Sequence, residues 1–291
     1  MDDPDHRVED AADSAMGELK RRSAPIAFTY TLSFLENLAE LSYPWAIGIA
    51  VNGLLIGDSS LVWPLVAIWL AHIIVGAARQ IYDTRLFSAL AAAMALKTVR
   101  DQRAYGAPVS EVSARIEMLE ELIDFLEEDA PVLMEMLVGL VGSLVFLTLY
   151  DASSGAIMLA LMVPVLALNA VMGLRAFRSN VALNTQWEKQ VQAISDKRPR
   201  RWRLHFGRMA QWRIRLSDLD AATWSISQLL VLVAVVIVLY RTATAPEALA
   251  GTVVAIIAYA LRIEAGIDEI PSIVHKLGRL IDIRRRIAHD T

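Results

Sequence analysis

Six long apolar stretches alternate with charged ones, and this pattern constrains the chain more than any other feature. The stretches are residues 27–56, 61–81, 131–150, 155–176, 222–240 and 249–267. Each approaches or exceeds the ~20 residues that a helix needs to cross the ~30 Å hydrocarbon core of a bilayer. A chain of 291 residues that is 55% hydrophobic is also more apolar than an ordinary soluble protein. The sequence therefore predicts an all-α polytopic membrane protein with six transmembrane helices.

The positive charges predict how these helices are oriented. Of the 28 lysines and arginines, only Arg241 falls in a short loop and only Arg262 lies well inside a predicted span. Lysine and arginine are retained on the cytoplasmic side of membrane proteins. We therefore expect both termini in the cytoplasm. No signal-peptide pattern is found near the start, so the first apolar segment is expected to be retained.

Composition suggests three parts along the chain. Residues 1–22 are acidic with few large apolar side chains, so we expect a disordered cytoplasmic tail. Residues 23–283 would form the six-helix membrane domain, and residues 284–291 a second cytoplasmic tail. Cysteine is absent, which excludes disulfides and thiolate metal sites. No metal site is predicted.

Two charged segments, residues 82–130 and 177–221, are too long for plain loops. In residues 112–126, apolar side chains recur every three or four positions opposite acidic ones, which is a helical period. The Tyr105-Gly106-Ala107-Pro108 sequence should break the first segment, and the region around residues 196–199 the second. Each segment is therefore predicted to be a helical hairpin that extends ~35–40 Å beyond the bilayer, with a returning arm in the second from about Arg208.

This arrangement resembles the transmembrane domain of ABC exporters, and in particular the membrane regions of that family that occur as free-standing bacterial proteins. Several short sequences resemble the family as well: Glu36-Asn37-Leu38, Tyr43-Pro44, Gly48, Tyr82-Asp83-Thr84-Arg85, Ala114-Arg115, Asp124-Phe125-Leu126-Glu127 and Pro131. The resemblance implies a homodimer with exchanged hairpins, located in a bacterial cytoplasmic (inner) membrane. It also implies a small coupling helix at each hairpin tip that docks on an ATPase domain. The tip residues are then Tyr105, Gly106, Pro108 and Ser110 in the first hairpin, and Arg198, Pro199, Arg201 and Trp202 in the second.

The chain lacks the GxxxxGK sequence, followed by serine or threonine, that cradles nucleotide phosphates. We therefore expect no enzymatic activity and no cofactor bound by this chain. ATP would act only through a partner, a separately encoded nucleotide-binding ATPase subunit.

Ionisable residues inside a bilayer are costly and indicate function by default. Counted inward from the outer ends at 1.5 Å per residue, Glu40 lies ~24 Å deep, Glu135 ~22 Å, Arg262 ~20 Å and His72 ~17 Å. Glu36 should share a helix face with Glu40 because the two are four residues apart, and Glu264 extends this layer. These residues predict a net acidic cavity that takes a cationic or zwitterionic substrate, or protons. The structural alternative is that Arg262 simply pairs with Glu40 or Glu36.

The second hairpin carries a basic stretch with interleaved aromatic residues, from residue 197 to residue 215. Attraction to anionic lipids explains it in the simplest way. Docking on an acidic groove of the ATPase partner is the sharper alternative. Nucleic acid is not an expected partner, because the adjacent spans place this stretch at a membrane surface.

Three functions remain open from the sequence. The first is the membrane subunit of an ABC-type transporter, dimeric, alternating between inward and outward openings and driven by a separate ATPase. The second is a proton-coupled secondary transporter with the exporter fold, in which Glu36, Glu40 or Glu135 carries the proton. The third is a membrane scaffold or regulator without transport activity.

Overall fold

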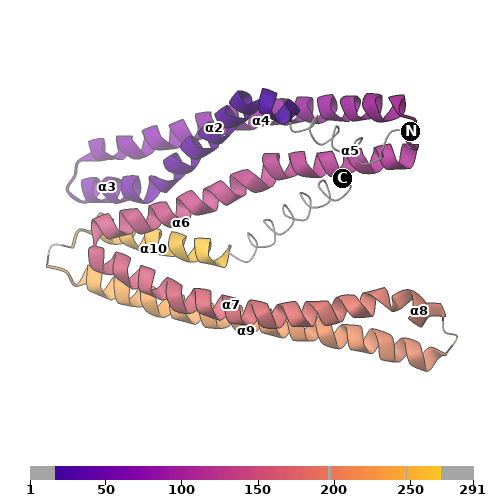
Figure 1. The fold of residues 1–291 in the computed structure, drawn as a ribbon. Helices are drawn as coiled ribbons and strands as arrows, with labels where there is room; N and C mark the ends of the chain where they lie inside the picture. Colours follow the sequence, from indigo (N-terminus) through magenta and orange to yellow (C-terminus); the bar gives the residue numbers. More distant parts are fainter. Residues whose placement is uncertain (1–16, 196–197, 247, 270–291) are drawn as a thin grey trace. The chain divides into compact units, whose positions relative to one another are not determined.

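The computed structural model describes residues 17–195, 198–246 and 248–269, and the regular secondary structure of these residues is entirely helical (Figure 1). The chain forms two compact units. The first comprises Met1–Phe146 together with Glu247–Thr291, and the second comprises Leu147–Pro246. Each unit is described by itself below.

In the first unit, α2 packs along α4, α3 packs along α10, and α5 returns along α4. Its helices are α2 (Ser23–Leu41), α3 (Tyr43–Leu55), the short 3-10 helix η1 (Ser59–Val62), α4 (Trp63–Ala104), α5 (Val109–Asp124), the π-helical turn η2 (Phe125–Asp129), most of α6 (Ala130–Tyr150) and α10 (Ala250–Asp268). The second unit contains α7 (Ala152–Glu188), α8 (Gln190–Ser195) and α9 (Pro199–Ala243).

The first predicted span, residues 27–56, is divided into two helices at Ser42. Pro44 explains the break, because proline has no N–H to donate to the carbonyl four residues earlier and its ring crowds that carbonyl. The hydroxyl of Tyr259 in α10 donates to the carbonyl of Leu41 beside the break, at 3.1 Å. The two halves therefore have different neighbours, with α2 lying against α4 and α3 against α10.

Small residues allow α3 and α10 to approach closely. A Cβ atom at Gly48 would lie only 2.7 Å from the carbonyl oxygen of Gly251. The Gly251 N–H donates to Oδ1 of Asn52 at 2.7 Å. Close helix contacts of this kind are typical of membrane proteins, in which packing and polar contacts hold helices together.

Among the described residues, five helical stretches are long and apolar enough to cross a membrane. They are Ser59–Ala104, Val109–Tyr150, Ala152–Trp187, Pro199–Ala243 and Ala250–Asp268. Neither α2 nor α3 alone belongs to this set. The all-helical membrane fold is confirmed, and the count of six spans stays a prediction that requires α2 and α3 to cross together.

The first hairpin was predicted with the correct break. Helix α4 ends at Ala104, Gly106 adopts a positive φ of 76° and α5 begins at Val109. Phe87, Leu90, Met94 and Ile123 form the buried core between the two arms. The tip itself is a turn, residues 105–108, and these residues form no separate coupling helix of the kind that the resemblance implied.

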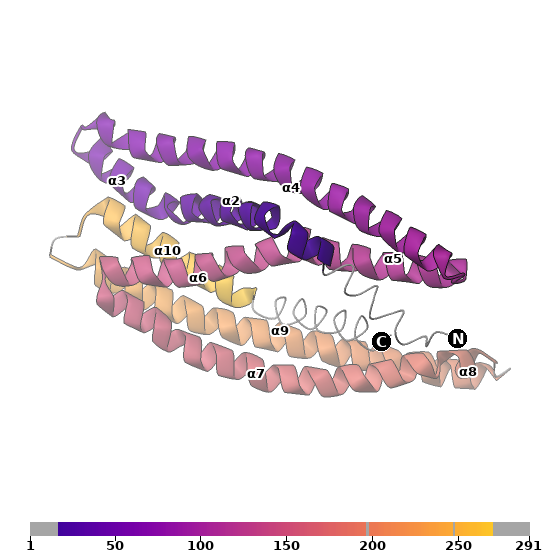
Figure 2. The ribbon, with the colours of Figure 1, turned by 45° about the horizontal axis from the view of Figure 1, so that its top comes forward.

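The second hairpin packs along its whole length, with α7 and α9 side by side in both views (Figures 1 and 2). Val165 of α7 and Val238 of α9 are fully buried. The returning arm begins at Pro199, nine residues earlier than the predicted start at Arg208, and continues without interruption to Ala243. Proline suits the first turn of a helix, where its missing N–H would have no partner. The short helix α8 precedes the tip, and Asp196 and Lys197 lie outside the described residues.

Candidate functional site

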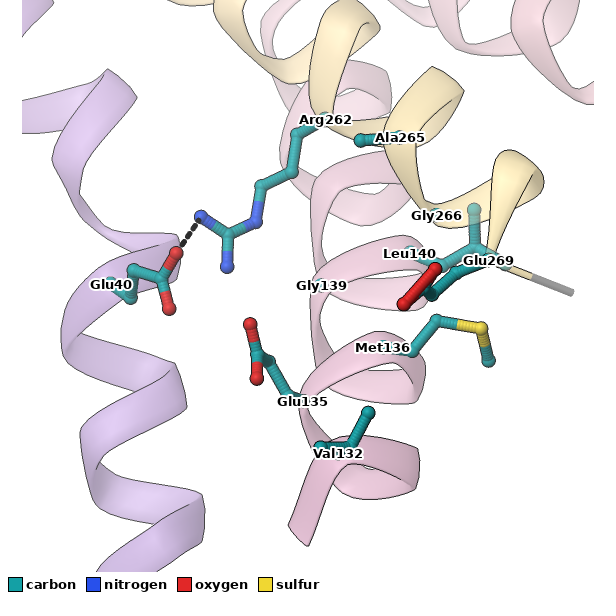
Figure 3. Close-up of a pocket in the computed structure, with 10 residues that line it drawn as sticks. All are labelled: Glu40, Val132, Glu135, Met136, Gly139, Leu140, Arg262, Ala265, Gly266 and Glu269. Atoms are coloured by element: carbon teal, nitrogen blue, oxygen red, sulfur yellow. Dashed lines mark ion pairs between the residues drawn. The ribbon is translucent and has the colours of Figure 1, made fainter. Parts of the chain in front are cut away.

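A cavity of about 370 Å³ lies among α2, α6 and α10 in the first unit (Figure 3). Its charged lining comes from Glu40, Glu135, Arg262 and Glu269. The remaining lining residues are small or apolar: Val132, Met136, Gly139, Leu140, Ala265 and Gly266. The cavity thus combines three carboxylates with one guanidinium on a largely apolar wall.

One ion pair crosses the cavity. Nη1 of Arg262 in α10 lies 3.1 Å from Oε1 of Glu40 in α2, and both side chains are partly exposed. Gly139 makes room for the guanidinium, since a Cβ atom there would lie 3.4 Å from Nε of Arg262. Glu135 precedes Gly139 by one helical turn, and Figure 3 shows its carboxylate directed toward the same space. Among the described residues Glu135 forms no ion pair, so the cavity keeps an excess of negative charge.

Three of the six residues predicted for the polar layer meet in this cavity: Glu40, Glu135 and Arg262. Glu36 and His72 lie elsewhere, and Glu264 is not part of the cavity lining. Glu36 was expected to share a face with Glu40. Residues four apart on a helix are offset by ~40°, which lets neighbouring carboxylates turn to different helices. Glu40 accordingly reaches α10, whereas Glu36 reaches α4.

Glu36 belongs to a second group of polar residues, which we call the α4 charge network: Glu36, Tyr43, His72, Arg79 and Asp83. Arg79 donates from Nε to Glu36 and from Nη1 to Oδ2 of Asp83, the latter at 2.9 Å. Nε2 of His72 lies 3.9 Å from Oε1 of Glu36. The Tyr43 hydroxyl lies 2.5 Å from Nδ1 of His72.

Arg79 and Asp83 are the residues that sequence reasoning missed. Neither was among the residues that the sequence placed in the polar layer. A signal was nevertheless present, because His72, Gly76, Arg79 and Asp83 follow one another at spacings of four, three and four, which places them on one face of a helix. Gly76 completes this stripe, since a Cβ atom there would lie 2.7 Å from Oε1 of Glu36.

The predicted tip residues lie at the ends of the hairpins. Tyr105 is 61% exposed and Trp202 is 39% exposed. Gly106, Pro108 and Ser110 form the first turn and the start of α5, while Arg198, Pro199 and Arg201 open α9. Two arginines further along the basic stretch have partners within the second unit. Arg213 lies over the ring of Trp187, at 5.3 Å, and Arg215 over Trp212, at 4.9 Å. The first of these cation–π contacts joins α9 to α7 and helps to hold the hairpin together, whereas the second lies within α9.

Comparison with known proteins adds one match. The sequence model of the family described as ABC transporter transmembrane region matches residues 18–251, which include most of the cavity and the whole α4 charge network. A search of curated proteins gives no match.

Proposed function

The chain belongs to the ABC transporter transmembrane region family, and we propose that it forms the substrate pathway of a dimeric transporter in a bacterial cytoplasmic membrane. In this proposal both termini are cytoplasmic, the protein opens alternately to the two sides, and a separately encoded ATPase drives the change. The observation that carries the proposal is the acidic cavity among α2, α6 and α10.

The charges of the cavity favour a solute with a positively charged group. Arg262 is already paired with Glu40, so it is a poor receptor for an anion. Glu135 has no such partner among the described residues and faces the cavity. A carboxylate in a low-dielectric environment gains most from a cation that approaches it closely. The apolar wall formed by Val132, Met136 and Leu140 would accommodate the uncharged part of the same solute.

The second unit supports the proposed dimer. Residues 147–246 pack as a compact unit with α7 against α9. An element that is compact by itself is suited to exchange between two copies of a chain. The exposed apolar side chains of this hairpin, such as Leu174 at 68% and Leu229 at 61%, are available for lipid or for a second copy.

The hairpin ends would receive the ATPase. Only the second tip carries a short separate helix, α8, whereas the first is a simple turn. We therefore expect the second tip to provide the larger part of the contact. Removing the exposed Tyr105 side chain should affect coupling less than removing Trp202.

Transport by purified protein, reconstituted in liposomes together with its partner ATPase and supplied with ATP, tests the proposal. Uptake of a fluorescent organic cation should depend on Glu135, so that Glu135→Gln lowers uptake at least tenfold. Glu117→Gln is the matched control, because Glu117 is exposed on α5 away from the cavity. Equal losses in both variants, or normal uptake in Glu135→Gln, would contradict the proposed role of the cavity.

A second candidate function is transport coupled to protons without an ATPase. The observation that favours it is the imidazole of His72 beside the carboxylate of Glu36. In liposomes without any ATPase, uptake driven by a pH gradient alone would support this function and count against the first. A scaffold role without transport would be supported only if neither ATP with a partner ATPase nor a pH gradient drives any flux.

A further inference from the structure

One imidazole touches both helices into which the first predicted span is divided. His72 projects from α4. Its Nδ1 lies 2.5 Å from the hydroxyl of Tyr43, in the first turn of α3. Its Nε2 lies 3.9 Å from Oε1 of Glu36, near the end of α2. Because the break at Ser42 falls between Glu36 and Tyr43, His72 bridges the break.

The number of protons on His72 decides how it makes this bridge. A neutral imidazole has one donor and one acceptor nitrogen, so the Tyr43 hydroxyl can donate to Nδ1 while Nε2–H faces Glu36. An imidazolium donates from both nitrogens. The Tyr43 hydroxyl must then accept, and a full positive charge stands beside the Glu36 carboxylate. Hydrogen bonds between charged partners are shorter and stronger than neutral ones.

The surroundings of His72 hold an excess of negative charge. Glu36 and Asp83 share the single cation of Arg79, which leaves one net negative charge when His72 is neutral. Asp83 is buried, and its Oδ1 atom has no hydrogen-bond partner. A second cation at His72 would neutralise the group, and buried charges are tolerated best when they are balanced.

The charged and titratable groups that approach from the other packed elements do not supply that cation. Glu127 of η2 and Tyr30 of α2 interact electrostatically with Asp83. Glu40 of α2 acts in the same way on Tyr43. Glu135 of α6 interacts electrostatically with Glu36 and Arg79. All four groups are acids, so they add no positive charge to the α4 charge network.

Aromatic stacking holds the bridge in position. The Tyr43 ring stacks on His72 with 5.4 Å between ring centroids and on Trp69 with 5.0 Å between them. Gly76, one turn after His72, leaves the space that the Glu36 carboxylate occupies. Neither ring nor carboxylate needs to move far to bind a protonated imidazole.

We propose that His72 is a proton-binding site and that its protonation clasps α2 and α3 to α4 across the break at Ser42. The ligand is a proton, and its effect is to restrict the angle between the two halves of the broken helix. Glu40, which lines the cavity, lies directly before the break, so the clasp would also restrict one wall of the cavity. The inference does not depend on the proposed transport function, because the clasp can be measured without a substrate or an ATPase.

Spin labels across the break test the proposal. The chain contains no cysteine, so Thr31→Cys in α2 and Leu54→Cys in α3, both at exposed positions, label only the two halves. The distance between the labels is measured by pulsed electron paramagnetic resonance on full-length protein in lipid nanodiscs. As the pH is lowered, the distance distribution should narrow.

Three variants decide the outcome. His72→Gln should abolish the narrowing, while Glu117→Gln, at an exposed position on α5, should leave it unchanged. Tyr43→Phe keeps the aromatic ring and His72 but removes the hydroxyl that contacts Nδ1 of His72. The narrowing of the distance distribution should then fall to about half or less of that in the parent protein. The proposal is overturned if the parent shows no narrowing, if His72→Gln retains it, if Tyr43→Phe retains all of it, or if Glu117→Gln removes it. Tyr43→Phe also serves as the informative variant if His72→Gln does not fold.

Discussion

The cavity and the α4 charge network each contain a carboxylate from α2, but the surroundings of the two carboxylates differ. Glu40 shares a roomy cavity with a partly exposed arginine and a second carboxylate. Glu36, one turn earlier, is held by Arg79, is approached by His72 and lies over Gly76. The difference indicates that the network is built to hold helices together, whereas the cavity leaves charge available for a ligand.

Removal of Arg79 should have the largest effect on stability. Arg79→Gln would leave Glu36 and the buried Asp83 without their counter-charge. Loss of one partner from a buried ion pair is strongly destabilising, and we expect about 2–3 kcal/mol because Arg79 is partly exposed. Thermal unfolding in detergent measures the loss. Arg79→Lys should recover only part of it, since a lysine cannot bind both carboxylates in the same fixed geometry.

The equivalent change in the cavity should cost much less. Arg262→Gln leaves Glu40, whose side chain is 32% exposed, without its partner, but it strands no buried carboxylate like Asp83, so we expect a loss of about 0–1 kcal/mol. The same variant should nevertheless alter uptake of a cationic probe, because it leaves Glu40 as a further free carboxylate. A loss of stability as large as that of Arg79→Gln would remove the distinction between the two sites.

Two glycines allow the tightness of packing in the α4 charge network to be compared with that in the cavity. A Cβ atom at Gly76 would come within 2.7 Å of Glu36, whereas one at Gly139 would stay 3.4 Å from Arg262. Overpacking typically costs about 1–3 kcal/mol. Gly76→Ala should fall within that range and Gly139→Ala should be nearly neutral, as judged by thermal unfolding. If the order were reversed, the cavity would be the more tightly packed of the two sites.

A carboxylate outside both groups serves as a reference for these comparisons. Asp151 accepts hydrogen bonds from Ser154 and from the backbone at the start of α7, and the Ser154 hydrogen bond lowers the pKa of Asp151. Because this pKa is depressed in the folded protein, the stabilisation is complete at neutral pH. It is lost as the pH falls below the ordinary value of about 4 and through the lowered pKa.

Asp151→Ala should therefore lower stability by about 1 kcal/mol at pH 7, the usual contribution of a helix N-cap. The difference between parent and variant should shrink as the pH falls below about 4, and melting temperatures measured across this pH range report it. If the stability difference between parent and variant stays constant with pH, the Asp151 carboxylate is not its source. Asp58, which caps the short helix η1 in the first unit, should show the same sign with a smaller amplitude.

Periodicity was sufficient to predict the long elements. The apolar stretches and the pattern of residues 112–126 correctly indicated helices that continue beyond the spans, and the glycine and proline near residue 106 correctly indicated where the first hairpin turns. The break at Ser42 was not predicted, although Pro44 was visible. Proline is tolerated within membrane helices when neighbouring groups satisfy the freed carbonyls, so its presence alone does not show that a helix is broken.

The candidate site was predicted in part. Depth estimates correctly brought Glu40, Glu135 and Arg262 together, because the rise of a helix is nearly constant. Glu36 was placed beside Glu40 by its spacing of four residues, but its partner Arg79 lies on a different helix from the partner of Glu40. Depth along a helix is a property of one chain segment, whereas the direction in which a side chain turns depends on which helices pack beside it.

The order and lengths of apolar and charged residues by themselves determined that this chain is helical, that it belongs in a membrane and where its first hairpin turns. These are local properties, set by the cost of leaving backbone and side chains unsatisfied in hydrocarbon. Only the tertiary structure decided that α2 binds α4 while α3 binds α10, and so which carboxylate became part of a network and which was left facing a cavity. That division depends on contacts between residues more than forty positions apart, such as Glu36 with Arg79 and Glu40 with Arg262, and no local pattern specifies them.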